Sequence, residues 1–223
     1  QRAMASNGHQ ASADGGVLLE PKYVSELPSD LLLGQIVGGS HAVFAQLGRG
    51  SMGSVYKAKH IKLGRIVAVK TIRPDGLSPD ETDEIKGRFL REAKALSGLR
   101  HNGIVTVYDY GEHDNKLFMV LEFIRGESLW HRLARDGRLP VDRVVSMLRQ
   151  LLEAMSEMHR IGIVHRDIKP SNVMLDMSST DEERVVLIDF GVAKVARDDS
   201  LGDLAPITQM DVVVGTPKYM APE

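Results

Sequence analysis

The residues best suited to carry out chemistry lie in one stretch, from Ile163 to Leu175. Asp167 offers a carboxylate, Lys169 an ammonium group and Asn172 an amide, all within a short loop between two apolar segments. Such a set can hold a hydroxyl nucleophile, a phosphoryl group and a divalent cation at the same time. The stretch is therefore suited to phosphoryl transfer, and other elements must supply a cradle for phosphates.

A glycine-rich turn is the first candidate for that cradle. Residues 41–47 and 54–60 are predicted strands, and Gly48, Gly50 and Gly53 lie between them. A dinucleotide fingerprint needs a helix after its glycines, and a P-loop needs Gly-Lys-Ser/Thr, so neither motif is present. The turn is predicted to be a hairpin whose backbone N–H groups approach phosphates.

Two charged side chains follow this hairpin along the chain. Lys70 lies near the end of an apolar strand, residues 65–72, where a lysine is either solvated or a buried charge that needs a partner. Glu92 lies in a predicted helix, residues 83–99, whose apolar positions have helical spacing. Further strands are predicted at residues 104–110 and 116–123.

The second half of the sequence is mainly helical. Helices are predicted over residues 129–135 and 141–160, and the methionines of the longer one are interpreted as core residues. The polar residues 176–184 are predicted to form a hairpin tip or a small insertion. The apolar residues 185–188 are predicted to form a buried strand that leads to Asp189.

Three motifs in this order resemble those of protein kinases. They are His165-Arg166-Asp167 with Asn172, Asp189-Phe190-Gly191, and the closing Ala221-Pro222-Glu223. Asp-Ile-Lys-Pro-Ser-Asn and Gly-Thr-Pro-x-Tyr-Met-Ala-Pro-Glu are of the Ser/Thr type, similar to the eukaryotic-like kinases of bacteria.

The resemblance implies an α+β, bilobal fold. We expect a disordered leader over residues 1–30, an antiparallel β N-lobe with one helix over 31–124, and a helical C-lobe over 125–223. Because the family continues past Ala-Pro-Glu, we expect a C-lobe that is cut short and a fragment that is poorly stable and inactive on its own.

The resemblance also implies ATP and Mg²⁺ as cofactors. Asp167 would orient the substrate hydroxyl or accept its proton, and Lys169 would neutralise the γ-phosphate. Lys70 would contact the α- and β-phosphates and pair with Glu92. Asn172 and Asp189 would hold Mg²⁺. The implied nucleotide-binding residues are Leu47, Gly48, Gly50, Gly53, Val55, Ala68, Lys70, Leu121, Glu122, Ile124, Ser128 and Met174.

Other side chains are given structural or regulatory roles by the same resemblance. His165 is expected to pack against Phe190, in a stack that continues through Leu96 and Val107. Arg166 would pair with a phosphate on the activation loop, for which Thr208 is the predicted acceptor.

The composition excludes several other classes. The chain has 223 residues, a formal net charge of −2 and no cysteine. It therefore has no disulfide framework, no thiolate metal site and no excess of positive charge for nucleic acid. We expect a cytoplasmic domain that acts on protein substrates, without a membrane segment of its own, although an anchor outside these residues and dimerisation both stay open.

Two alternatives to a Ser/Thr protein kinase stay open. One is a pseudokinase-like scaffold that binds ATP without turnover. The other is a kinase-like phosphotransferase that acts on small molecules such as aminoglycosides.

Overall fold

The computed structural model describes residues 32–50, 53–72, 79–165, 167–178, 183–189 and 217–219. The predicted leader lies outside these ranges. In chain order the elements are β1 (Ile36–Val37), β2 (His41–Gly50), β3 (Gly53–His60), β4 (Ile66–Ile72), α2 (Pro79–Ser97), β5 (Val107–His113), β6 (Lys116–Glu122), β7 (Gly126–Ser128), α3 (Leu129–Asp136), α4 (Val141–Arg160), the 3₁₀ turn η1 (Pro170–Asn172), β8 (Val173–Asp176), β9 (Arg184–Leu187) and η2 (Pro217–Tyr219).

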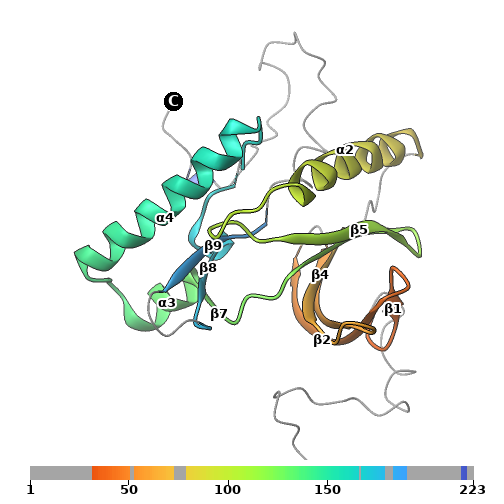
Figure 1. Ribbon diagram of the computed structural model, residues 1–223, viewed down its shortest axis with the longest axis horizontal. Coiled ribbons are helices and arrows are strands. Elements are labelled where there is room, and N and C mark those ends of the chain that lie inside the picture. Colours follow the sequence, from red (N-terminus) through yellow and green to blue (C-terminus); the bar gives the residue numbers. More distant parts are fainter. Residues whose placement is uncertain are drawn as a thin grey trace, which may run out of the picture.

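Two antiparallel sheets organise the described chain. The larger one has six strands in the order β1-β2-β3-β4-β6-β5, and the smaller one has the order β7-β8-β9. Figure 1 shows α2 along the larger sheet, and α3 and α4 beside the smaller one. The two sheets are joined by the short segment between β6 and β7.

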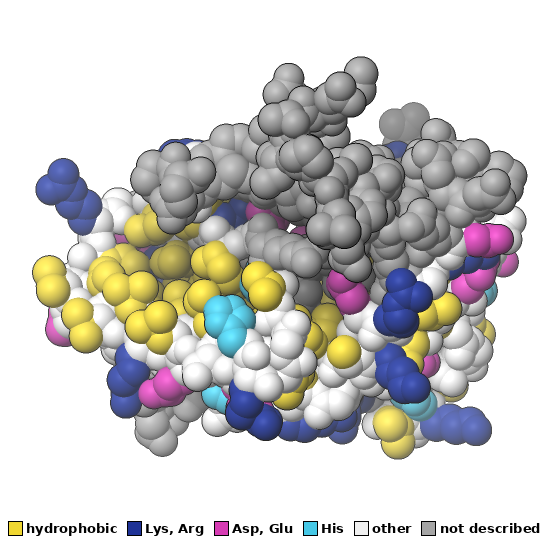
Figure 2. All heavy atoms as spheres, turned by 90° about the horizontal axis from the view of Figure 1, so that it is seen from above, with side chains coloured by type: hydrophobic (Ala, Val, Ile, Leu, Met, Phe, Trp, Pro, Cys, Tyr) yellow, Lys and Arg dark blue, Asp and Glu magenta, His cyan; other side chains and the backbone are white. Residues whose placement is uncertain are grey.

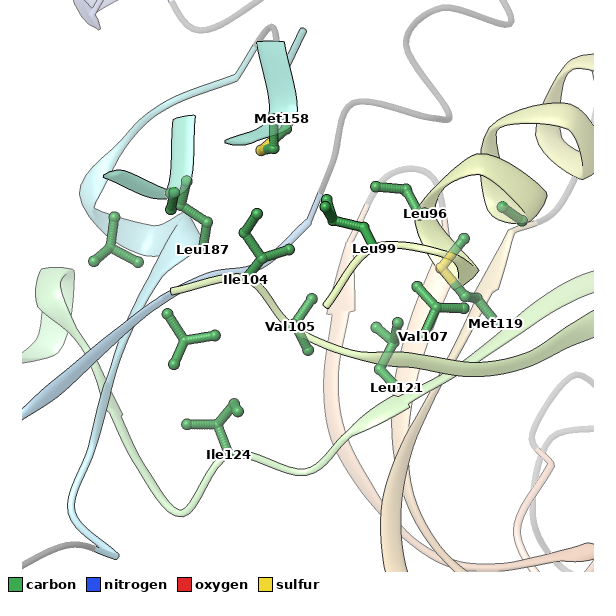
Figure 3. Close-up of a cluster of buried hydrophobic side chains, with 14 of the residues drawn as sticks. Leu96, Leu99, Ile104, Val105, Val107, Met119, Leu121, Ile124, Met158 and Leu187 are labelled. Atoms are coloured by element: carbon green, nitrogen blue, oxygen red, sulfur yellow. The ribbon is translucent and has the colours of Figure 1, made fainter. Parts of the chain in front are cut away.

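The larger sheet separates two hydrophobic cores, and its interior strand β6 contributes to both of them. Because successive side chains of a strand point to opposite faces, Phe118 and Val120 join one buried cluster, whereas Leu117, Met119 and Leu121 join the other. The second cluster also contains side chains of α2, α4, β8 and β9. Figure 3 shows part of it, with Leu96 of α2 and Val107 of β5 beside Met119.

The same alternation sets the direction of Lys70 on β4. Val67 and Val69 are buried in the cluster on the far side of the sheet from α2. Ala68 and Ile72 contact the cluster that contains α2 residues. Lys70 therefore points to the face of the sheet where α2 and the smaller sheet lie.

Helix α4 packs with only one of its apolar faces against the described residues. Met147, Ala154 and Met158 are buried, whereas Val145 and Leu152 are 60% and 63% exposed. Figure 2 shows hydrophobic side chains gathered on the side of the molecule where α4 lies. Within the described residues, no helix is long and apolar enough to cross a membrane.

Most strands predicted from the sequence are present with small changes in their ends, and the longer C-terminal helix has the predicted bounds. Three short strands, β1, β7 and β8, were not predicted. The α2 helix begins at Pro79 and ends at Ser97, earlier at both ends than predicted.

Candidate active site

A mainly apolar cavity of about 520 Å³ lies between the two sheets. Its walls come from β2, β3, β4 and β6 on one side and from β7, α3 and β8 on the other. Most of the predicted nucleotide-binding residues line it: Leu47, Gly48, Val55, Ala68, Lys70, Leu121, Glu122, Ile124, Ser128 and Met174. The predicted metal ligand Asp189 also lines it.

Several other residues of the lining were not predicted. They are Val105, Phe123, Gly126, Glu127, Trp130, His131, Ser171 and Ile188. Ser171 and Ile188 could have been found, because each directly precedes a predicted site residue. Trp130 and His131 depend on how α3 packs against the short strand β7, which has no sequence pattern of its own.

The glycines of the β2–β3 hairpin have different roles. Gly48 lines the cavity, whereas Gly53 faces β4 at φ +154°. A Cβ at Gly53 would lie 1.8 Å from the carbonyl oxygen of Thr71, so no side chain fits there. Gly53 therefore allows the close pairing of β3 with β4, and its direct contact with phosphates stays a prediction, as does that of Gly50.

Lys70 and Asp189 form an ion pair at one end of the cavity. Lys70 comes from β4 in the larger sheet, and Asp189 follows β9 in the smaller one. Asp189 has φ +59°, a conformation that is uncommon for residues with a side chain. Glu92 is half-buried on α2, and its predicted pairing with Lys70 stays a prediction.

The loop that contains Asp167 is held by its own polar side chains. The Asn172 amide donates to the Asp167 backbone oxygen at 2.9 Å and to Oδ2 of the Asp167 carboxylate at 3.1 Å. The Lys169 ammonium lies 2.8 Å from the same Oδ2. Both Asp167 and Asn172 are buried. The sequence therefore predicted a constellation that the fold does bring together.

His165 has a structural role in this loop. It is buried, its Nδ1 accepts from the Asp167 N–H at 3.3 Å, and its Nε2 lies 3.1 Å from the Ile188 carbonyl oxygen. Accepting at Nδ1 places the ring proton on Nε2, which then donates to Ile188. Burial lowers the pKa of the imidazole. A neutral His165 thus links the Asp167 loop to the strand that leads to Asp189.

Ser128 lies in the cavity wall, but its hydroxyl already has partners. It accepts from the His131 N–H at 3.3 Å and lies 2.9 Å from His131 Nδ1, so it caps the N-terminus of α3. The predicted contact of Ser128 with a ribose stays a prediction. The predicted regulatory residues Arg166 and Thr208 lie outside the described residues, as does Phe190, which was expected to pack against His165.

The comparisons with known proteins agree with this geometry. The family model of the protein kinase domain matches residues 41–223. The serine/threonine-protein kinase pkn3 of Myxococcus xanthus is 37% identical over 196 residues, which cover 87% of this chain and 35% of that protein. A probable serine/threonine-protein kinase of Streptomyces coelicolor is 41% identical over 191 residues, covering 84% of this chain and 27% of that protein.

A solved structure shows the same similarity. A mutant of the PknI kinase domain of Mycobacterium tuberculosis aligns with a TM-score of 0.61 at 30% identity, covering 73% of this chain and 63% of that one. The chain belongs to the protein kinase family, and the predicted α+β bilobal kinase fold is confirmed. It spans between about a quarter and about a third of the length of the two curated relatives described above.

Proposed function

We propose that the protein transfers the γ-phosphoryl group of ATP to Ser and Thr hydroxyls of proteins. The observation that carries this proposal is the Asp167 carboxylate, held by Lys169 and Asn172 in the loop whose Ser171 lines the cavity. Residues 31–124 would be the N-lobe and 125–223 the C-lobe. The reaction would take place in the cytoplasm.

The cavity suits ATP because its chemistry changes from one end to the other. Apolar side chains such as Val55, Ala68 and Met174 can enclose an adenine ring and exclude water from it. Lys70 offers its charge to the phosphates at the far end. Asp167 can then orient the incoming hydroxyl and take its proton, while Lys169 neutralises charge on the transferred group.

The donor groups of the site fit Mg²⁺. Asp189 offers a carboxylate, and Asn172 can offer its amide oxygen because its NH₂ group donates to Asp167. These are hard oxygen ligands, which Mg²⁺ prefers, usually together with phosphate oxygens and water. When bound, the ion would neutralise negative charge on the phosphates. Within the described residues, no group of three or more His, Cys, Asp or Glu could hold a metal ion.

The relatives support a protein substrate. The two curated relatives described above have names that describe serine/threonine-protein kinases, and they align over most of this chain. We extend this substrate class to the present protein as part of the proposal.

An Asp167→Asn variant of the full-length protein tests the proposal. The amide keeps the size of the side chain but cannot accept a proton, so we expect the rate of phosphate transfer to a basic protein to fall about 10²- to 10⁴-fold. Nucleotide binding, measured with a fluorescent ATP analogue, should be retained. The assay follows transfer from radiolabelled ATP and identifies the phosphorylated residues.

Two results would contradict the proposal. Phosphate found on aminoglycosides and never on protein would identify a small-molecule phosphotransferase. Nucleotide binding by the wild-type protein with no turnover on any hydroxyl would indicate an ATP-binding scaffold.

A further inference from the structure

A second cavity shares one lining residue with the cavity between the two sheets. Its volume is about 870 Å³. It is lined by Arg100, His101, Asn102, Gly103, Thr106, Tyr108, Glu122, Arg149, Gln150, Glu153 and Arg184. Glu122, the last residue of β6, is the one residue that lines both cavities as described. A change in the position of the Glu122 side chain therefore alters a residue that lines the proposed nucleotide pocket.

The Glu122 side chain is held by Arg184, the first residue of β9. Nη1 of Arg184 lies 2.7 Å from Oε1 of Glu122, and Nη2 lies 3.2 Å from Oε2. This two-pronged geometry fixes both the distance and the plane of the carboxylate. The hydrogen bond to Glu122 is the main reason why the pKa of Arg184 is raised. β6 and β9 belong to different sheets, so the pair joins the two sheets.

Arg184 also contacts two further segments. Its Nε donates to the Asn102 carbonyl oxygen at 2.8 Å, and Nη1 lies 3.2 Å from Oδ2 of Asp176 on β8. The loop of Asn102 continues directly into a bridge between Ile104 and Leu187, whose side chains lie together in Figure 3. One guanidinium group thus holds the loop after α2, the end of β6 and the β8–β9 hairpin at fixed separations.

The loss of Arg184 would destabilise the position of the Glu122 side chain, because of the charges around the arginine. Asp176 is 5% exposed, and its carboxylate shares the Arg184 cation with that of Glu122. Without the arginine, two partly buried carboxylates would face each other with less compensation, which raises the free energy of this arrangement. The Glu122 N–H donates to the Thr106 carbonyl oxygen at 2.8 Å, and its carboxylate accepts from the Thr106 N–H at 3.4 Å. The loss of Arg184 would therefore act on the orientation of the Glu122 side chain.

We propose that Arg184 is a positioning residue, which sets nucleotide affinity by holding Glu122 in the orientation that the nucleotide pocket requires. This rests on the proposed binding of ATP in the cavity between the sheets. Arg184 lies outside the lining of that cavity as described, so it acts on the nucleotide through Glu122 and not by contact.

An Arg184→Gln variant of the full-length protein tests this role. We expect the KM for ATP to rise about 5- to 10-fold while kcat changes less than about twofold, because binding is weakened and the Asp167 loop is untouched. The affinity for a fluorescent ATP analogue, measured without protein substrate, should fall by the same factor. A Glu122→Gln variant should have a similar effect, and the double variant should add little to either.

Arg143→Gln is the matched control. Arg143 makes a comparable two-pronged pair with Glu183, at 3.1 and 2.5 Å, and is similarly half-buried, but it lies outside the lining of both cavities. It should leave the KM for ATP close to that of the wild type. Arg184→Lys keeps the charge without the fork, and its affinity should lie between those of the wild type and of Arg184→Gln. It also provides the measurement if Arg184→Gln does not fold.

The inference is overturned if the Arg184 variants bind nucleotide as the wild type does, or if Arg143→Gln weakens binding as strongly. These results differ from a failure of the proposed function. In that case the wild-type protein itself would lack nucleotide binding or phosphate transfer.

Discussion

The two contacts on Oδ2 of Asp167 indicate how the loop is ordered before any substrate arrives. Asn172 and Lys169 both approach this oxygen, at 3.1 and 2.8 Å. The carboxylate therefore cannot rotate without losing a charge-assisted contact. Such preorganisation is what orientation of a hydroxyl requires. The same contact holds the Lys169 ammonium beside the Asp167 carboxylate.

His165 makes the stability of the protein depend on pH. Burial lowers the pKa of its imidazole in the folded state below the ordinary value of 6.5. As the pH falls below 6.5, the unfolded chain therefore binds a proton that the folded protein does not, and the free energy of unfolding decreases. We expect His165→Gln to reduce this decrease between about pH 7 and pH 5.

The measurement is urea denaturation of the full-length protein and the variant over this pH range. The decrease should not vanish in the variant, because burial also lowers the pKa of His41. An unchanged pH dependence in His165→Gln would contradict the assignment of a buried, neutral imidazole.

The β2–β3 hairpin makes different demands on its glycines. Gly53→Ala would place a methyl group 1.8 Å from the Thr71 carbonyl oxygen, so β3 and β4 would have to separate at the Gly53–Ile72 pair. We expect a loss of about 2–3 kcal/mol in the free energy of unfolding. Gly48→Ala is the control, because among the described residues no atom lies within 4 Å of the added Cβ.

Urea denaturation of the two variants gives this comparison directly. The hairpin would be wrongly described if Gly48→Ala and Gly53→Ala were equally stable. Nucleotide affinity separates a second effect, since Gly48 lines the cavity and its methyl group can hinder binding without loss of stability.

The elements differ in how far the sequence alone predicts them. Helix α4 has the predicted bounds because its apolar residues repeat with the helical period over its whole length. The period could not tell which apolar face is buried, and Val145 and Leu148 are 60% and 51% exposed while Met158 is buried. That choice depends on which elements pack against α4.

The strand β7 was missed for a related reason. Its residues, Gly-Glu-Ser, have no alternating pattern, and the strand exists because it pairs with β8. A Cβ at Gly126 would lie 1.8 Å from the Leu175 carbonyl oxygen, so this pairing also requires glycine. The sequence could predict Asp167, Asn172 and Asp189 because they have fixed offsets within motifs. It could not predict Trp130, His131 or Arg184, whose positions depend on contacts between distant segments.

Each of the two sheets provides part of the candidate active site. The larger sheet provides Lys70 and most of the apolar wall, and the smaller sheet leads to Asp189 and borders the Asp167 loop. The ion pair between Lys70 and Asp189 crosses from one sheet to the other. Because Lys70 and Asp189 are 21% and 45% exposed, this pair contributes little to the stability of the fold, on the order of 1 kcal/mol or less.

A Lys70→Met variant should therefore separate stability from activity. We expect the free energy of unfolding without nucleotide to change by about 1 kcal/mol at most. We expect phosphate transfer to fall about 10²-fold or more, because the phosphates lose a fixed positive charge at one end of the cavity. Lys86→Met is the control, since Lys86 forms an ion pair of similar exposure with Glu112 at 2.8 Å, outside the lining of the cavity. It should resemble Lys70→Met in urea denaturation and the wild type in transfer from radiolabelled ATP. If Lys70→Met instead unfolded easily, or kept full activity, the contact between the sheets would be structural, and Lys70 would not act on the nucleotide.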